Sequence, residues 1–413
     1  MPTNNSVTLR GLFIVPAAVC MLAGLDAALL LLGVPAPYSS SSLANSHGVL
    51  MTLGFVGTLI SLERAIAVKN RWGYLSPLLL GAGGVALLVG VSSTIAFGAM
   101  LAGCVALCAV YIPLWHRNRE NAVLIQALGA VLAAIAALLL TAQLPPRVVL
   151  VWLAGFVILT IAGERLELAR FALTQRDTAI LLNLSFGFMV ASAVAFLFPQ
   201  FGYPLLGVVL AIMTLWLAWK DVARTLVRSS GSRRFMASCM LLGYFWLSVA
   251  SCVWIVGPAF EGQRYDAVIH AIFIGFTMSM IMAHASTILP AVIRRPLPYR
   301  TVMWVPMLVV HLALLVRVWL GDFLGIPLAH QIGGVGNVIG LLAFFVIAVG
   351  SCVLGESSKP KSQSPTPHSS SRRASGAPST LVSPSSATQS DNAATPSTSK
   401  GTHSSSTSPE VLS

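Results

Sequence analysis

The segment Gly54–Arg64 reads Gly-Phe-Val-Gly-Thr-Leu-Ile-Ser-Leu-Glu-Arg, and its pattern returns twice further along the chain. Gly155–Arg165 reads Gly-Phe-Val-Ile-Leu-Thr-Ile-Ala-Gly-Glu-Arg, and Gly275–Ala285 reads Gly-Phe-Thr-Met-Ser-Met-Ile-Met-Ala-His-Ala. In each segment a Gly-Phe pair precedes a polar residue by the same interval, and an isoleucine stands three positions before that residue. The polar residues are Glu63, Glu164 and His284, and the isoleucines are Ile60, Ile161 and Ile281. Internal repeats of this kind predict a fold built from repeated units.

The composition of the chain indicates a membrane protein. Hydrophobic residues make up 56% of its 413 residues, charged residues only 9%, and the mean hydropathy is +0.82. Soluble globular proteins carry roughly 25% charged residues, so an ordinary soluble enzyme is excluded. The apolar residues form runs of about 20 residues, the length with which a helix crosses a bilayer. The predicted segments are 11–35, 47–69, 74–93, 96–115, 122–142, 148–172, 179–199, 203–220, 234–256, 265–290, 298–321 and 330–354.

The three repeated segments fall in the second, sixth and tenth of these runs, which lie four apart and run in the same direction. We therefore predict an all-α polytopic membrane protein with about 12 transmembrane helices in three four-helix units. The alternative is that helices ending at a cytoplasmic face commonly finish in charged residues. That alternative accounts for the Glu-Arg pairs but not for the shared position of the Gly-Phe pairs.

Composition also divides the chain into two regions. Residues 1–354 form the predicted transmembrane domain, whereas 355–413 consist almost entirely of small, polar and basic residues with hardly a large apolar one. Such a segment cannot bury enough apolar surface to offset its chain entropy, so we predict a disordered Ser/Thr/Pro-rich cytoplasmic tail.

The basic residues are distributed unevenly between the predicted connections. The connections on the side of the N-terminus hold fourteen lysines and arginines within 69–300, whereas those on the opposite side hold only Arg147 and Arg264. Because cytoplasmic loops carry the excess of Lys and Arg, both termini are predicted to be cytoplasmic in a multi-pass protein of the cell inner (plasma) membrane. The net charge of +12 is then explained by the topology of the protein in the lipid bilayer, and nucleic acid is not needed as a partner.

Two histidines stand at similar depths in repeated helices. His47 opens the second segment and His270 lies one turn into the tenth, seven and five residues before Gly54 and Gly275 respectively. Two neutral imidazoles on facing helices are what a six-coordinate haem iron requires as axial ligands. We predict that His47 and His270 bind haem b. For His47 alone, an interfacial histidine at a helix start is the alternative.

Two charged residues near these histidines suit a haem site. Asp266 lies one turn before His270 and is placed to accept its second imidazole proton, a bond that fixes the tautomer. Arg317 is a costly intramembrane cation for which a haem propionate would be a partner. Asp26 in the first segment is the competing partner of Arg317 by charge.

The polar residues that end the repeated segments form a second candidate site. Glu63, Glu164 and His284 lie at the same end of their helices, where they would bind copper or another metal or relay protons. Structural pairing of the glutamates with arginines is the alternative reading. A second haem is poorly supported, because the second helix offers no histidine at the depth of His284.

The pattern His47-Gly48-x-x-Met51 at the start of the second of twelve helices resembles subunit I of haem-copper oxidases. In that family histidines of helices 2 and 10 hold the low-spin haem, and twelve helices form three four-helix arcs. The histidine-rich tenth helix also resembles NnrS proteins, twelve-span proteins linked to nitric oxide and nitrite metabolism. The chain departs from the oxidases because its sixth and seventh helices contain no histidine to bind copper. The oxidases' binuclear centre is therefore absent.

These observations lead to one functional expectation and two rivals. The resemblance implies a haem protein acting in electron transfer or in the response to nitric oxide or other nitrogen oxides, with a redox partner or a small gas as ligand. Whether it is an enzyme stays open. The rivals are a secondary transporter that uses buried Asp and Glu, and a non-catalytic membrane scaffold that acts through its tail.

Overall fold

The computed structural model describes residues 5–38, 41–170, 172–293 and 297–355, and the regular elements of these residues are all helical. In chain order they are α1 (Asn5–Leu31), α2 (Ser41–Val49), η1 (Leu50–Gly57), α3 (Thr58–Val68), η2 (Arg71–Tyr74), α4 (Leu75–Leu88), α5 (Ser93–Asn118), α6 (Asn121–Thr141), α7 (Pro146–Leu168), α8 (Gln175–Leu197), α9 (Pro199–Lys220), α10 (Ala223–Leu226), α11 (Gly231–Val256), α12 (Gly262–His270), η3 (Ala271–Met278), α13 (Ser279–Ile293), η4 (Thr301–Met303), α14 (Trp304–Leu315), η5 (Val316–Phe323) and α15 (Pro327–Leu354). The tail predicted over 355–413 lies outside the described residues from 356 onward.

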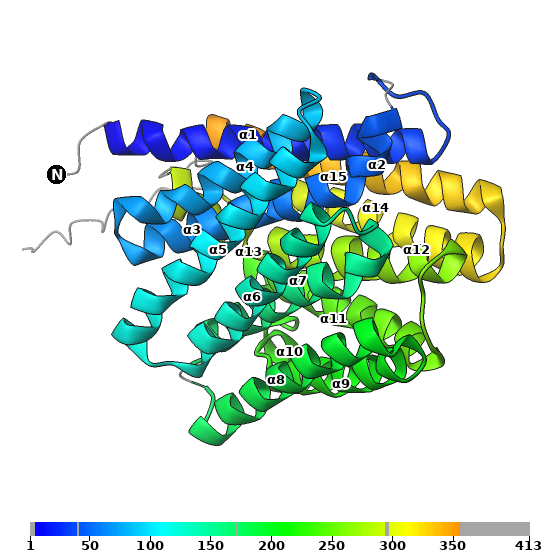
Figure 1. Ribbon diagram of the computed structural model, residues 1–413. Coiled ribbons are helices and arrows are strands. Elements are labelled where there is room, and N and C mark those ends of the chain that lie inside the picture. Colours follow the sequence, from blue (N-terminus) through cyan, green and yellow to red (C-terminus); the bar gives the residue numbers. More distant parts are fainter. Residues whose placement is uncertain (1–4, 39–40, 171, 294–296, 356–413) are drawn as a thin grey trace, which may run out of the picture. The chain divides into compact units, whose positions relative to one another are not determined.

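Each long helix, or each set of helical elements that follow one another without a break, forms one straight segment that we call a rod. Apart from the short α10, the rods run back and forth between two ends of the bundle (Figure 1). Within the described residues, eleven helices are long and apolar enough to cross a membrane. A twelfth rod, η2–α4, has only 14 residues of α-helix after its 3₁₀ turn, fewer than the roughly 20 that span a bilayer. Each of the twelve predicted segments corresponds to one rod, and the all-α fold is confirmed.

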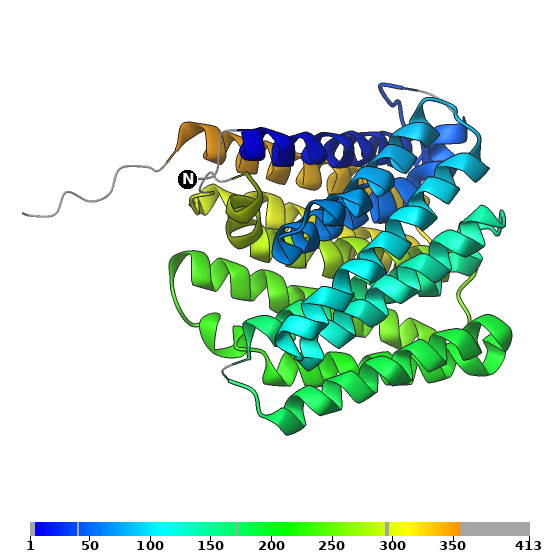
Figure 2. The ribbon, with the colours of Figure 1, turned by 60° about the vertical axis from the view of Figure 1, so that its left-hand side comes forward.

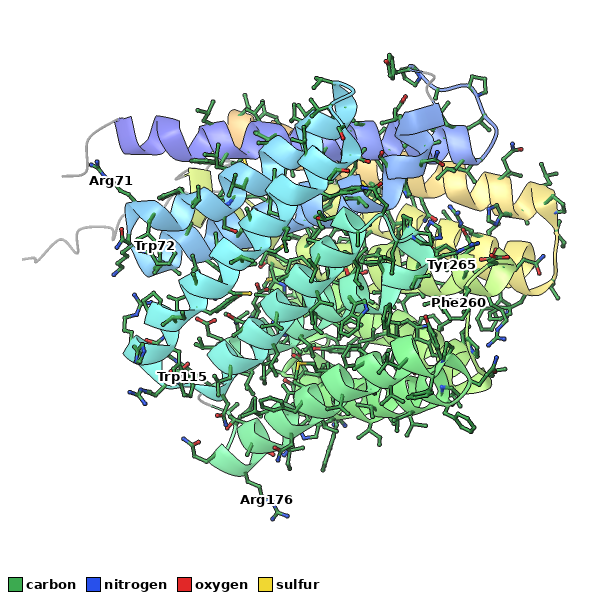
Figure 3. The ribbon with its side chains drawn as sticks, in the orientation of Figure 1. Arg71, Trp72, Trp115, Arg176, Phe260 and Tyr265 are labelled. Carbon is green, nitrogen blue, oxygen red and sulfur yellow. The ribbon has the colours of Figure 1, made fainter. Side chains whose placement is uncertain are left out.

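The two ends of the bundle differ in the residues they carry. We call them the His47 end and the Arg64 end, after residues at the start and near the finish of the α2–η1–α3 rod. Figure 3 shows Trp72, Trp115 and Arg176 near the Arg64 end and Tyr265 near the His47 end. Aromatic and basic side chains of this kind are enriched where helices leave the hydrocarbon core. The assignment of the Arg64 end to the cytoplasm stays a prediction.

Local sequence signals set several helix starts. Pro146, Pro199 and Pro327 occupy the first helical positions of α7, α9 and α15, where the missing proline N–H costs no hydrogen bond. The α8 helix begins with a capping box, in which Thr174 and Asp177 satisfy each other's backbone N–H groups. These residues determine where the helices begin, which an apolar pattern alone does not specify.

The three rods that contain the repeated segments are the most buried ones. In the most apolar 18-residue stretch of α2–η1–α3, α7 and α12–η3–α13, 78%, 83% and 78% of residues are buried. Among the described residues, no other membrane-length helix exceeds 56%. The other rods surround them, and α1 packs beside α15, which brings the first rod against the last (Figures 1 and 2). The repeat therefore marks the helices that form the centre of the bundle.

The repeated glycines lie where a neighbouring helix comes close. A Cβ atom on Gly54 would lie 3.0 Å from the Cys20 sulfur, one on Gly155 would lie 2.5 Å from Leu132, and one on Gly275 would lie 2.3 Å from Trp246. The phenylalanine after each glycine is buried in every case. Small residues at helix contacts are typical of membrane bundles, because they let backbones approach. The Gly-Phe repeat thus serves the close packing of the central helices.

We expect Gly275→Ala to lower the stability of the protein. The new methyl group would overlap Trp246, a side chain that is 99% buried and cannot move into solvent, and overpacking of this kind costs about 1–3 kcal/mol. The measurement is the thermal unfolding midpoint in detergent. Gly98→Ala is the matched control, since its Cβ meets nothing within 4 Å and alanine favours the helix. An equal midpoint in the two variants would contradict this account.

Within the described residues, three rods contain a π-helical segment, in which the backbone hydrogen bonds span five residues. The segment η1 begins three residues after His47, η3 begins directly after His270, and η5 carries Arg317 and Asp322. Short π segments inside α-helices are often found at functional sites. All three surround the region described next.

Candidate functional site

A cavity separates the two π-containing repeat rods at the His47 end. His47 and His270 both line it, together with Arg317 and Tyr265, the last labelled in Figure 3. Its other walls come from α1, the first turns of α7, and α15. The cavity leaves about 90 Å³ free between its side chains. This is below the roughly 300–1,000 Å³ of small-molecule sites, so lining side chains would have to move before a larger ligand could enter.

The tautomer of His47 follows from its hydrogen bond. Its Nδ1 lies 2.7 Å from the carbonyl oxygen of Gly24 in α1. A carbonyl can only accept, so Nδ1 carries the proton and donates it. The unprotonated Nε2, for which the described residues supply no hydrogen bond, is therefore the nitrogen able to bind a metal.

His270 is held in the same way. Its Nδ1 lies 2.9 Å from the backbone oxygen of Asp266 and 3.2 Å from a carboxylate oxygen of the same residue. Both partners are acceptors, so Nδ1 again donates and Nε2 keeps its lone pair. Two imidazoles from two different rods thus line one cavity, each with a basic Nε2 and each oriented by a bond of the kind that fixes metal-binding histidines.

Asp266 also binds the predicted cation. Arg317 donates from Nε and one Nη to the two carboxylate oxygens of Asp266, both at 2.8 Å. The guanidinium is buried beside Gly334 and lines the cavity, and its remaining Nη makes no hydrogen bond within the described residues. Asp26, the predicted competitor for Arg317, instead accepts from the backbone N–H of Tyr38 at 3.3 Å. It lines a neighbouring cavity that is largely apolar.

The structure divides the three residues of the predicted second site between two networks. Arg64 contacts Glu63 at 2.5 Å and Glu164 at 3.9 Å, and a third carboxylate, Glu167, at 3.2 Å. Gln126 joins the same guanidinium at 3.0 Å. The glutamates are therefore paired with arginine, as the alternative reading had it.

His284 belongs to the second network. Its Nδ1 donates to the Met280 carbonyl, and its Nε2 accepts from Arg165 at 2.7 Å. Arg165 in turn forms a two-bonded ion pair with Asp221, whose carboxylate also accepts from Tyr244. Because Arg165 occupies the Nε2 lone pair, His284 could bind a metal only after that hydrogen bond is broken. A metal site built from Glu63, Glu164 and His284 stays a prediction that this arrangement does not favour.

Several polar residues of this region carry no motif in the sequence. Asn337 of α15 lines the cavity, donates to the Val310 carbonyl, and leaves its buried Oδ1 without a hydrogen bond in the described residues. Asp322 and His330 lie at the same end of the bundle, near Asp266. The only available signal was an ionisable or amide side chain in an apolar run, which marks a candidate site but not its partners.

Comparison with known proteins gives a fold and a family. A chain in a cryo-EM structure of a haem-copper terminal oxidase dimer matches with a TM-score of 0.56 and 11% sequence identity, over 87% of this chain and 84% of the other. At this identity the likeness shows the fold alone, and that fold confirms the predicted haem-copper oxidase-like arrangement. No curated protein matches the chain. The model of the family described as a domain of unknown function, DUF8744, matches residues 10–353, and the chain therefore belongs to that family.

Proposed function

We propose that this protein binds one b-type haem between His47 and His270 and uses it for electron transfer within the membrane. The observation that carries the proposal is that His47 and His270 line one cavity, each with its Nδ1 proton held by a backbone carbonyl oxygen and its Nε2 left unprotonated. Two neutral imidazoles of fixed tautomer are the donor set of a low-spin haem. The fold of the first comparison, that of a haem-copper terminal oxidase, supports the same reading.

The remaining residues of the cavity fit the rest of such a group. Its walls are mostly apolar, as a porphyrin requires, and the unused Nη of Arg317 would donate to a propionate carboxylate. Because the free volume is only about 90 Å³, side chains such as Met51 and Phe273 would have to turn aside for a flat macrocycle to enter. Methionine is flexible enough to do so at low cost.

Electron transfer is favoured over the binding of nitric oxide. A haem held by both His47 and His270 would supply reversible one-electron chemistry and would have no free coordination position for a gas. A role in the response to nitrogen oxides would require one imidazole to leave. His270 is held by two acceptors and is 92% buried, which opposes that movement. His47 has one such bond and is the more exposed of the two.

The test is a reduced-minus-oxidised visible spectrum of the detergent-purified full chain, with haem counted by pyridine haemochrome. We expect a sharp low-spin α-band and about one haem per chain. The spectrum of the reduced protein should not change on addition of nitric oxide or carbon monoxide at concentrations that bind five-coordinate haem. A protein made with ample haem that contains none would exclude the proposal and return attention to transport by the buried carboxylates.

We expect Asp266→Asn to weaken haem retention without abolishing it. The amide cannot neutralise Arg317 and accepts less strongly from His270, although the backbone acceptor of His270 remains. Loss of a partner that orients a metal ligand typically costs 10–100-fold in affinity. The measurement is the rate of haem transfer to excess apomyoglobin. Asp26→Asn is the matched control, because Asp26 contacts neither His270 nor Arg317 in the structure; equal rates in both variants would argue against the role of Asp266.

A further inference from the structure

Three side chains from three rods converge at the His47 end, where Asp266 joins a second group of residues. Asp266 comes from α12, Asp322 from η5 and His330 from α15, and one ligand atom of each lies within 4.8 Å of the others. The Nδ1 atom of His330 is 3.0 Å from an Asp322 oxygen and 3.8 Å from an Asp266 oxygen. No other group of three His, Cys, Asp or Glu side chains among the described residues meets so closely.

The local backbone explains why these groups meet. Asp322 lies in the π-helical segment η5, and the residue before it, Gly321, packs against the backbone of His330. A Cβ on Gly321 would lie 2.6 Å from the His330 Cα, so only glycine permits this approach of the two rods. The connection between them, 324–326, is short and turns at Gly325 with φ of +68°, a conformation that glycine adopts without strain.

Burial leaves part of this cluster unsatisfied. Asp322 is 97% buried, and its Oδ2 has no hydrogen-bond partner among the described residues, although its Oδ1 accepts from His330. Two carboxylates here face one guanidinium, that of Arg317, which gives a local charge of −1 when His330 is neutral. An ionised carboxylate with a bare buried oxygen is costly, so the site requires either a proton on Asp322 or a cation beside it.

The distances and the chemistry suit a metal ion. Ligands bound at about 2.0–2.2 Å from one ion in tetrahedral or octahedral geometry lie about 3.0–3.5 Å apart, close to the separations of His330 from the two carboxylates. Asp266 is shared with Arg317, but each carboxylate oxygen has a second lone pair. A cavity lined by Gly262, Gln263 and Gln331 as well as the three ligands opens beside the cluster and supplies an entry path.

We propose that Asp266, Asp322 and His330 bind a divalent metal ion. One imidazole and two carboxylates form a donor set of intermediate hardness, which suits Zn²⁺ and Mn²⁺ better than the soft Cu⁺. The ion takes the place of the His330 proton, which leaves Nδ1 for solvent when the metal binds. The site does not require haem, because none of its ligands is an axial histidine.

The experiment is a Mn²⁺ titration of the full-length, chelator-treated protein in detergent, in which electron paramagnetic resonance measures the free ion. We expect about one tightly bound Mn²⁺ per chain, displaced by equimolar Zn²⁺. Asp322→Asn and His330→Gln, which preserve side-chain size, should each weaken binding at least tenfold. Asp26→Asn should leave binding unchanged, because that carboxylate lies outside the cluster.

Two results would overturn the proposal. One is wild-type protein that binds no stoichiometric Mn²⁺ or Zn²⁺, which would show that a proton, and not a metal ion, neutralises Asp322. The other is affinity that survives both substitutions, with His330→Gln decisive if Asp322→Asn does not elute as a single species in gel filtration. Haem counted on the same samples separates this proposal from the previous one, since metal binding can fail while haem is retained, and the reverse.

Discussion

Replacing either His47 or His270 by alanine is expected to remove the low-spin α-band from the purified protein entirely. Each substitution deletes one of the two imidazoles that line the cavity, and a single remaining imidazole cannot keep the iron six-coordinate. The measurement is the reduced-minus-oxidised spectrum with haem content per chain. Because His270 is more buried and has two acceptors, its loss should lower haem content more than the loss of His47.

Two controls make this result specific. His116→Ala removes an exposed histidine at the opposite end of the bundle and should leave the band unchanged. Adding imidazole to His47→Ala should restore a six-coordinate spectrum, because the deleted ring leaves a space of its own shape. A band that persists in both alanine variants would place the haem elsewhere.

The second large effect concerns stability. Asp221→Ala should destabilise the protein by about 3–5 kcal/mol, because it leaves the Arg165 guanidinium buried without its ion-pair partner. Both side chains of the pair are at least 94% buried, and the two bonds between them measure 2.9 Å. The same substitution removes the acceptors of the Tyr244 hydroxyl and the Ala223 N–H. We expect a large fall in the thermal unfolding midpoint.

The exposed ion pair between Arg147 and Glu261 provides the control. Its side chains are 50% and 70% exposed, and pairs of this kind contribute roughly 0–1 kcal/mol. Glu261→Ala should therefore leave the midpoint nearly unchanged. A similar small change for Asp221→Ala would show that water reaches the Arg165 network.

The pH dependence of the Arg165–Asp221 pair has a definite sign. Burial raises the pKa of Asp221, but the hydrogen bonds and charge of Arg165 outweigh it, and the pKa lies below its usual value of 3.8. A carboxyl group whose pKa is lowered by folding stabilises the folded state above its unfolded pKa and loses that effect as the pH falls through the folded value. The contribution of Asp221 is thus complete at neutral pH and disappears only in strong acid.

The sequence predicted the helices well because the signal is local. A run of about 20 apolar residues specifies a membrane helix wherever it occurs, so the twelve segments matched twelve rods to within a few residues at most ends. The exception is α4, which has only 14 residues. The apolar run from which it was predicted continues past the end of the helix. The spacing of Gly54, Gly155 and Gly275 also predicted three equivalent helices, and the rods that carry these glycines are the most buried membrane-length helices of the described residues.

The π-helical segments were outside the reach of sequence periodicity. An apolar stretch such as Ala271–Met278 has no feature that separates α from π hydrogen bonding. Helical phase counted at 100° per residue does not hold across such a segment, so the relative directions of His270 and His284 could not be derived from their separation. The tertiary structure determined that His270 faces the cavity whereas His284 contacts Arg165.

By itself, then, the sequence determined the class of protein, the number and order of its helices and the depth of His47 and His270. Each of these depends on hydrophobic length and on position along one helix. The tertiary structure alone decided which charge meets which: Arg317 with Asp266 rather than Asp26, Arg64 with three glutamates, and Asp322 with His330. Such pairings depend on side chains that meet from helices distant in sequence, because in a medium of low dielectric each buried charge takes the nearest partner that packing brings within reach.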